Sequence, residues 1–263
     1  MTDRLSNSGT ESASAGRSDA GGQHGGTARL AAPRGLAFAV KWFLPILLAG
    51  LSSGLTMDFM RGRFDKEPPT FANPTAEQTA QYNRQRQSAL RWSAAASTSS
   101  SGVVLAAFFG LALGLVGGSV WRGVAGIMCG AATAAVLAGL GGMVAQRCYA
   151  VVSVSGKSQP PMWDVLMQLT FWLPAAIAVA AAAAATIRSG QMLRVALASL
   201  AGAVVASVVV PILGTVLFLI TLRSSRDVVP PDTLSHCLLM GVIGSLALGS
   251  VIVAVFGRQH SVQ

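Results

Sequence analysis

The sequence predicts an all-α integral membrane protein with about six transmembrane helices packed in tight hairpins. Hydrophobic residues make up 52% of the 263 residues and charged residues only 11%, whereas soluble domains carry about 25% charged residues. The charges cluster in short breaks between apolar runs of about 18 residues or more, and about 20 helical residues cross the hydrocarbon core of a bilayer. Glycine and alanine recur at four-residue spacing within these runs, which predicts close contacts between helices.

The N-terminal residues 1–34 are rich in Ser, Gly and Ala. Because this composition cannot bury a hydrophobic core, we expect a disordered polar tail. A polar stretch of about 34 residues does not resemble a secretory signal peptide, in which an apolar region follows a short basic start. Residues 35–257 are predicted to form one polytopic transmembrane domain.

Six apolar runs in this domain are long enough to be transmembrane spans. They lie near residues 36–60, 101–118, 122–146, 162–187, 192–222 and 233–256. Tryptophans near span starts are typical of the aromatic belt at a membrane interface, and four of the five follow this rule, namely Trp42, Trp92, Trp121 and Trp163. Pro45, Pro174 and Pro211 lie inside predicted spans, where proline kinks a helix.

The segment 61–100 is the one sizeable polar region after the tail, and we expect a basic extramembrane loop there. Asn73 followed by Pro74 is typical of a helix start. The proline-free residues 75–95 are predicted to form a basic surface helix that leads into the second span. Two interpretations of this helix remain open, because it could rest at the membrane interface or form a binding surface for a partner.

Residues 101–146 form a glycine-rich apolar run that is too long for one span. Arg122 interrupts the run, which predicts two antiparallel helices joined by a tight turn. Small residues four positions apart lie on one face of a helix, and in lipid such faces hold helices together by close backbone contact. The small residues in question are Gly110, Gly114 and Gly118, followed by Gly126, Gly130, Ala134, Ala138 and Gly142.

A probable internal repeat has a period of about 72 residues, since residues 118–144 align with residues 190–216. Arg122 aligns with Arg194 and Gly142 with Gly214. A Pro-Pro pair precedes each hairpin and the last span, at 68–69, 160–161 and 230–231. Because the repeated unit holds two spans, both copies face the same way, as in a parallel repeat. Composition bias alone also produces Gly/Ala matches, so the arginines and the Pro-Pro pairs are the stronger evidence.

Ionisable residues avoid the predicted mid-depth of every span. Lys41, Asp58, Asp164, Asp232 and His236 all lie near span ends, which argues against proton relays, voltage sensing and ion-coupled transport. Asp164 and Asp232 are interpreted as caps of helix N-termini. Together with Gln168 and His236, four residues further on, they alternatively form polar pairs at a pore mouth.

No motif in the sequence predicts catalysis, a cofactor or a metal. Residues 50–54 match G-x-S-x-G, but a nucleophile elbow needs a strand-to-helix turn and this match lies inside a predicted span. Cys129, Cys148 and Cys237 are far apart and are interpreted as small apolar packing residues. A P-loop, a dinucleotide fingerprint and an HExxH motif are absent from the sequence. We therefore predict no catalytic, cofactor-binding or metal-binding residues.

The net charge of +9 is interpreted as a membrane feature, with no nucleic acid as partner. Its Arg and Lys residues flank the apolar runs, where they anchor helix ends and meet anionic lipid headgroups. Their distribution leans weakly toward a cytoplasmic loop 61–100. The absence of a signal peptide and of paired cysteines favours the inner membrane of a bacterium.

Two functional hypotheses follow. The first is a non-catalytic membrane protein that acts as an assembly, scaffold or oligomer-forming subunit, with the lipid bilayer and a homo-oligomer or membrane-protein partner as its contacts. The alternative is a small-solute or lipid transporter or channel, which predicts a cavity lined by Thr170, Trp172 and the region of Pro211. An enzyme is not expected, because no residues of the required kind converge.

Overall fold

The computed structural model describes residues 34–61, 63–64, 75–116, 118–154, 161–187, 189–218 and 233–260. The regular elements in these ranges are six helices: α1 Arg34–Arg61, α2 Ala76–Val116, α3 Val120–Val154, α4 Pro161–Thr186, α5 Ser189–Phe218 and α6 Leu234–His260. Each helix contains a stretch long and apolar enough to cross a membrane, which confirms the predicted six-span, all-helical class. The predicted tail, apart from Arg34, lies outside the described residues.

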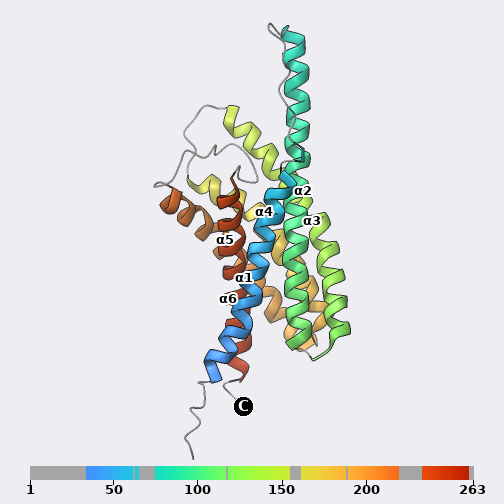
Figure 1. Cartoon of the computed structure of the whole chain (residues 1–263), viewed down its shortest axis with the longest axis vertical. Coiled ribbons are helices and arrows are strands. Elements are labelled where there is room, and N and C mark those ends of the chain that lie inside the picture. The colour runs from blue at the N-terminus through green and yellow to red at the C-terminus, as the bar shows by residue number, and fades with distance from the viewer. Residues whose placement is uncertain are drawn as a thin grey trace, which may run out of the picture.

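The six helices form a bundle in which neighbours in sequence are neighbours in space (Figure 1). Each helix packs against the next, α1 closes the bundle against α6, and α2 also contacts α4. α2 extends well beyond the other helices at one end of the bundle (Figure 1). We call residues 76–91 of α2 the arm, and the end of the bundle from which it rises the arm end.

The predicted surface helix and the second span together form one continuous helix, α2, from Ala76 to Val116. Its first buried residue is Ser93, which is 5% exposed and lies well before the predicted span start at residue 101. The polar residues between 93 and 101 lower the local hydropathy, which is why the sequence predicts a later start. Hydrogen-bond acceptors or partners on neighbouring helices are available to Ser93, Thr98, Ser99 and Ser101.

The first turn of α2 carries its own cap. The Thr75 N–H donates to Gln78 Oε1 at 3.0 Å, and the Gln78 N–H donates to Thr75 Oγ1 at 3.2 Å. This reciprocal pair is a capping box, which satisfies backbone donors that a helix start leaves open. The arm therefore has a defined beginning at the residues after Pro74, close to the predicted start.

The turn between α2 and α3 forms where the sequence predicts a tight hairpin. The Ser119 N–H donates to the Gly114 carbonyl at 3.1 Å and the Gly118 N–H to the Leu115 carbonyl at 3.2 Å, the paired bonds of a Schellman motif. Gly118 has φ of 68°, a left-handed conformation that favours glycine. Ser119 Oγ then accepts the Arg122 N–H at 3.4 Å at the start of α3.

Helix backbones approach closely at several glycines of the bundle. A Cβ atom at Gly110 would lie 2.8 Å from the Ile127 nitrogen on α3, and one at Gly54 would lie 2.6 Å from the Cys237 carbonyl on α6. Real Cβ atoms essentially never make contacts this short. These contacts therefore require glycine, because a larger residue would push the two helices apart.

The largest buried side chain, Trp172 of α4, fills the region where the sequence predicts a cavity. Trp172 is fully buried, and its ring occupies the space beside Gly244 of α6 that a Cβ would need. Its indole N–H donates to Gln168 Oε1 at 3.1 Å. The Thr170 carbonyl abuts Gly141 of α3. A cavity of about 10 Å³ lies beside Pro45, between α1 and α2.

We expect Gly114→Leu to destabilise the bundle by about 1–3 kcal/mol, the usual cost of overpacking. A Cβ at this position would lie 2.6 Å from the Gly123 nitrogen on α3. Gly214→Leu is the matched control, because nothing lies within 4 Å of a Cβ at Gly214. Thermal unfolding of both variants in detergent measures the difference. Equal melting temperatures would contradict close α2–α3 contact.

Candidate functional site

A run of hydroxyl side chains marks the part of α2 that enters the bundle. Residues 97–101 read Ser-Thr-Ser-Ser-Ser, and Ser97, Thr98 and Ser101 are 1% exposed or less. By local pattern this run lies at the boundary between the surface helix and the second span, and its contacts with α1 and α3 were not predicted. Five consecutive hydroxyl residues beside a long apolar run were the available signal, because buried hydroxyls in a membrane require hydrogen-bond partners.

One side of this run faces α1 and connects the two helices. Ser101 Oγ and Ser53 Oγ share a hydrogen bond, and both side chains are fully buried. Ser93 Oγ donates to the Arg61 carbonyl at 3.3 Å. These two contacts lie two turns apart on each helix, so α1 and α2 run antiparallel with a fixed register. We call this α1–α2 contact the hydroxyl seam. It consists of Ser93, Ser97 and Ser101 of α2 with the Arg61 carbonyl, Met57 and Ser53 of α1.

The other side of the run connects α2 to α3. Thr98 Oγ1 lies 2.8 Å from the Ala138 carbonyl and 2.7 Å from the Ala94 carbonyl of its own helix, so both compete for its one proton. Ser99 Oγ donates to the Ala135 carbonyl at 3.0 Å. Gly142 makes room for this contact, since a Cβ there would lie 2.6 Å from the Ala94 carbonyl. α2 is thus hydrogen-bonded to both of its sequence neighbours at nearly the same level.

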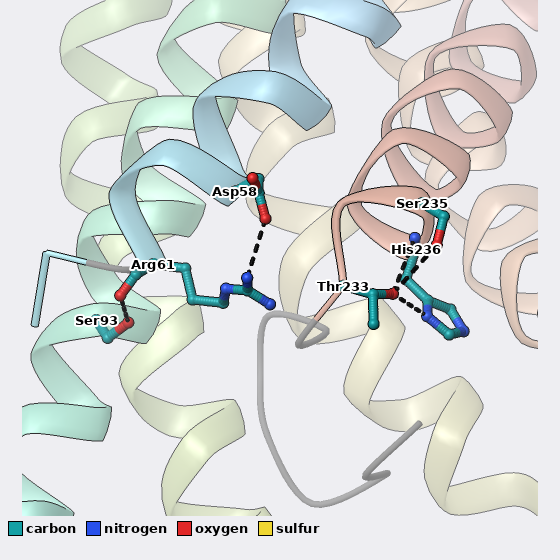
Figure 2. Close-up of polar contacts among 6 residues, drawn as sticks. All are labelled: Asp58, Arg61, Ser93, Thr233, Ser235 and His236. Atoms are coloured by element: carbon teal, nitrogen blue, oxygen red, sulfur yellow. Dashed lines mark hydrogen bonds and ion pairs between the residues drawn. The ribbon is translucent and has the colours of Figure 1, made fainter. Parts of the chain in front are cut away.

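A polar cluster lies at the arm end, where α1 ends and α6 begins (Figure 2). Arg61 pairs with Asp58 at 3.1 Å across one turn of α1. Thr233 Oγ1 accepts the His236 N–H at 3.4 Å and contacts His236 Nδ1 at 2.6 Å. Thr233 therefore caps α6. The predicted cap Asp232 lies outside the described residues.

The other residues singled out from sequence occupy separate places. Asp164 lies in the first turn of α4, which begins at Pro161. Gln168, its proposed partner at a pore mouth, instead orients Trp172. Ser52 lies in the interior of α1, where its carbonyl accepts Thr56 Oγ1 at 2.7 Å. None of Cys129, Cys148 and Cys237 forms a disulfide bond.

The contacts described at these sites are hydrogen bonds and the ion pair between Asp58 and Arg61. Among the described residues, no three His, Cys, Asp or Glu side chains gather closely enough to hold a metal ion. Most buried polar side chains among the described residues are hydroxyls, as in the hydroxyl seam, and Gln146 adds a buried amide. Such groups join helices or bind neutral molecules. A charged ligand would be disfavoured, because the seam contains no opposite charge to offset the cost of burying it.

The fold defines the class of protein at this point: a multi-pass helical membrane protein with six apolar helices. No family model, curated protein or solved structure matches the chain. The features that bear on function are therefore the arm, the hydroxyl seam and the packing of the bundle.

We expect Thr98→Val to destabilise the bundle by about 0.6–1.7 kcal/mol, the range measured for interhelical hydrogen bonds in membranes. Valine keeps the shape of threonine but cannot donate to the Ala138 carbonyl. Thr133→Val is the matched control, because Thr133 Oγ1 donates to the Cys129 carbonyl within its own helix at 2.8 Å. Reversible unfolding in detergent compares the two, and a larger loss at Thr133 would refute the role assigned to Thr98.

Proposed function

We propose that the chain is a non-catalytic membrane subunit that serves assembly, as a scaffold or as part of an oligomer. The observation that carries the proposal is the arm, a capped helix that leaves the bundle with most of its residues exposed. At 1.5 Å per residue the arm rises about 24 Å. It holds a polar helical surface away from the bundle, where another protein can reach it.

The physical properties of the arm favour a bound partner. A helix that is polar on every side draws little stability from packing. Residues 76–81 and 83–86 are all exposed. A partner that packs along these residues would supply the contacts that the bundle does not provide.

We also propose that the close glycine contacts belong to extended Gly/Ala faces and that the hairpins arose by duplication. In support, α3 and α5 each begin after a short connection and carry an arginine near their start, Arg122 and Arg194. The surroundings of the two copies differ. Gly142 packs tightly against α2, whereas nothing lies within 4 Å of a Cβ at the aligned Gly214.

The alternative is a small-solute or lipid transporter or channel. It draws support from the buried Ser53–Ser101 pair, which places polar atoms deep inside the bundle, and from the cavity beside Pro45. That cavity has apolar side chains around it and a volume of about 10 Å³. Ligand sites usually enclose about 300–1,000 Å³, so assembly is the stronger proposal. A bacterial inner membrane remains the proposed location.

Native mass spectrometry of the gently solubilised full-length chain tests the proposal. We expect a homo-oligomer or a stoichiometric protein complex that Gln81→Pro dissociates, because proline breaks a helix interior. Gln81→Ala is the matched control and should leave the assembly intact, since alanine favours the helix.

A monomer that carries one small molecule or lipid in fixed ratio would overturn the assembly proposal and favour the transporter. An assembly that Gln81→Pro leaves intact would show that the arm is not its basis.

A further inference from the structure

The hydroxyl seam has three levels, of which the middle one is incomplete. Ser93, Ser97 and Ser101 follow one another at intervals of four along α2, and Arg61, Met57 and Ser53 do so along α1. Hydrogen bonds join Ser93 to Arg61 and Ser101 to Ser53. The antiparallel register then places Ser97 opposite Met57, and both side chains are fully buried.

Ser97 Oγ has no hydrogen-bond partner in the part of the chain that the structure describes. A buried hydroxyl without a partner is costly, and most buried polar side chains in proteins have one. A thioether sulfur is only a weak acceptor, so Met57 does not satisfy this hydroxyl. The Ser97 hydroxyl is therefore a buried polar group that the described residues leave without a hydrogen-bond partner.

We propose that Ser97 binds a water molecule held between α1 and α2. A neutral ligand fits because the seam contains hydroxyls and carbonyls but no carboxylate, and an unpaired ion in such surroundings would be strongly disfavoured. A buried water needs two to four polar partners. The Ser97 hydroxyl is one such partner, and we assign the others to the oxygens of Ser93, Ser101 and the Arg61 carbonyl, one turn along the helices.

Water has a polar entrance to the seam at the arm end. Asp58 and Arg61 are partly exposed there, and the Arg61 carbonyl bonds Ser93, the first level of the seam (Figure 2). In the register of the two helices, Ser93 of α2 and Met57 of α1 lie between this cluster and Ser97. Methionine is flexible and adapts to irregular space, so its side chain can make room for a molecule of this size. Leu105, one turn beyond Ser101, is fully buried and apolar and closes the seam on the other side.

This inference does not rest on the proposed assembly function, because it concerns the interior of a single chain. Cysteine reactivity tests it in the full-length protein in lipid nanodiscs, after replacement of Cys129, Cys148 and Cys237 by alanine. Ser97→Cys and Leu105→Cys are each exposed to 2-aminoethyl methanethiosulfonate, which reacts with thiolates. Each unit by which a dry environment raises a thiol pKa lowers the thiolate fraction about tenfold.

We expect the cysteine at position 97 to react at least about tenfold faster than the cysteine at position 105, because only hydrated thiols ionise readily. Equal, slow reaction at both positions would overturn the proposal. It would indicate that the Ser97 hydroxyl bonds its own helix in a dry seam.

Thermal unfolding of the otherwise unaltered chain gives a second test, independent of the cysteine variants. If water bridges Ser97 to the seam, Ser97→Ala removes a partner from that water and lowers the melting temperature by more than Ser100→Ala does. Ser100 is the matched control, because its hydroxyl donates to carbonyls of its own helix. An unchanged or raised melting temperature for Ser97→Ala would refute the water site, since deletion of an unsatisfied hydroxyl is stabilising.

Discussion

Helices surrounded by lipid gain little from the hydrophobic effect when they meet, because the lipid tails are as apolar as the side chains that they replace. The bundle therefore depends on contacts that lipid cannot offer, and α2 concentrates them. Its hydroxyls reach Ser53 and the Arg61 carbonyl on α1, and the Ala138 carbonyl on α3. Through these bonds one helix fixes the positions of both neighbours in sequence.

Close packing extends this arrangement around the bundle. At Gly126 and Gly130 of α3 a Cβ would meet the Ala182 and Ala178 carbonyls of α4 at 3.0 and 3.1 Å. At Gly54 of α1 it would meet Cys237 of α6. Trp172 is buried in the interior of the bundle, and its ring packs against Gly244. Small residues on one helix are thus matched by backbone or by a large ring on the next.

Hydropathy was sufficient to predict six helices, because length and apolarity alone identify a span. It was insufficient for the start of the second span. Ser93 and Ser97 lower the local hydropathy, yet they are buried against α1. Which hydroxyls are buried depends on neighbours far away in sequence, so neither the seam nor the space taken by Trp172 beside Gly244 could be inferred from local pattern. The α2–α3 turn was predictable, since Gly118, Ser119 and Arg122 carry local signals.

The continuity of α2 has a mechanical consequence. Neither glycine nor proline occurs between Ala76 and Ser101, and kinks in helices arise mainly at such residues. The arm and the buried hydroxyls therefore belong to one stiff rod without a hinge. A force that tilts the tip of this rod acts as a lever on Ser93, Ser97 and Ser101. Motion of the arm is therefore mechanically coupled to the fit of α1 against α2.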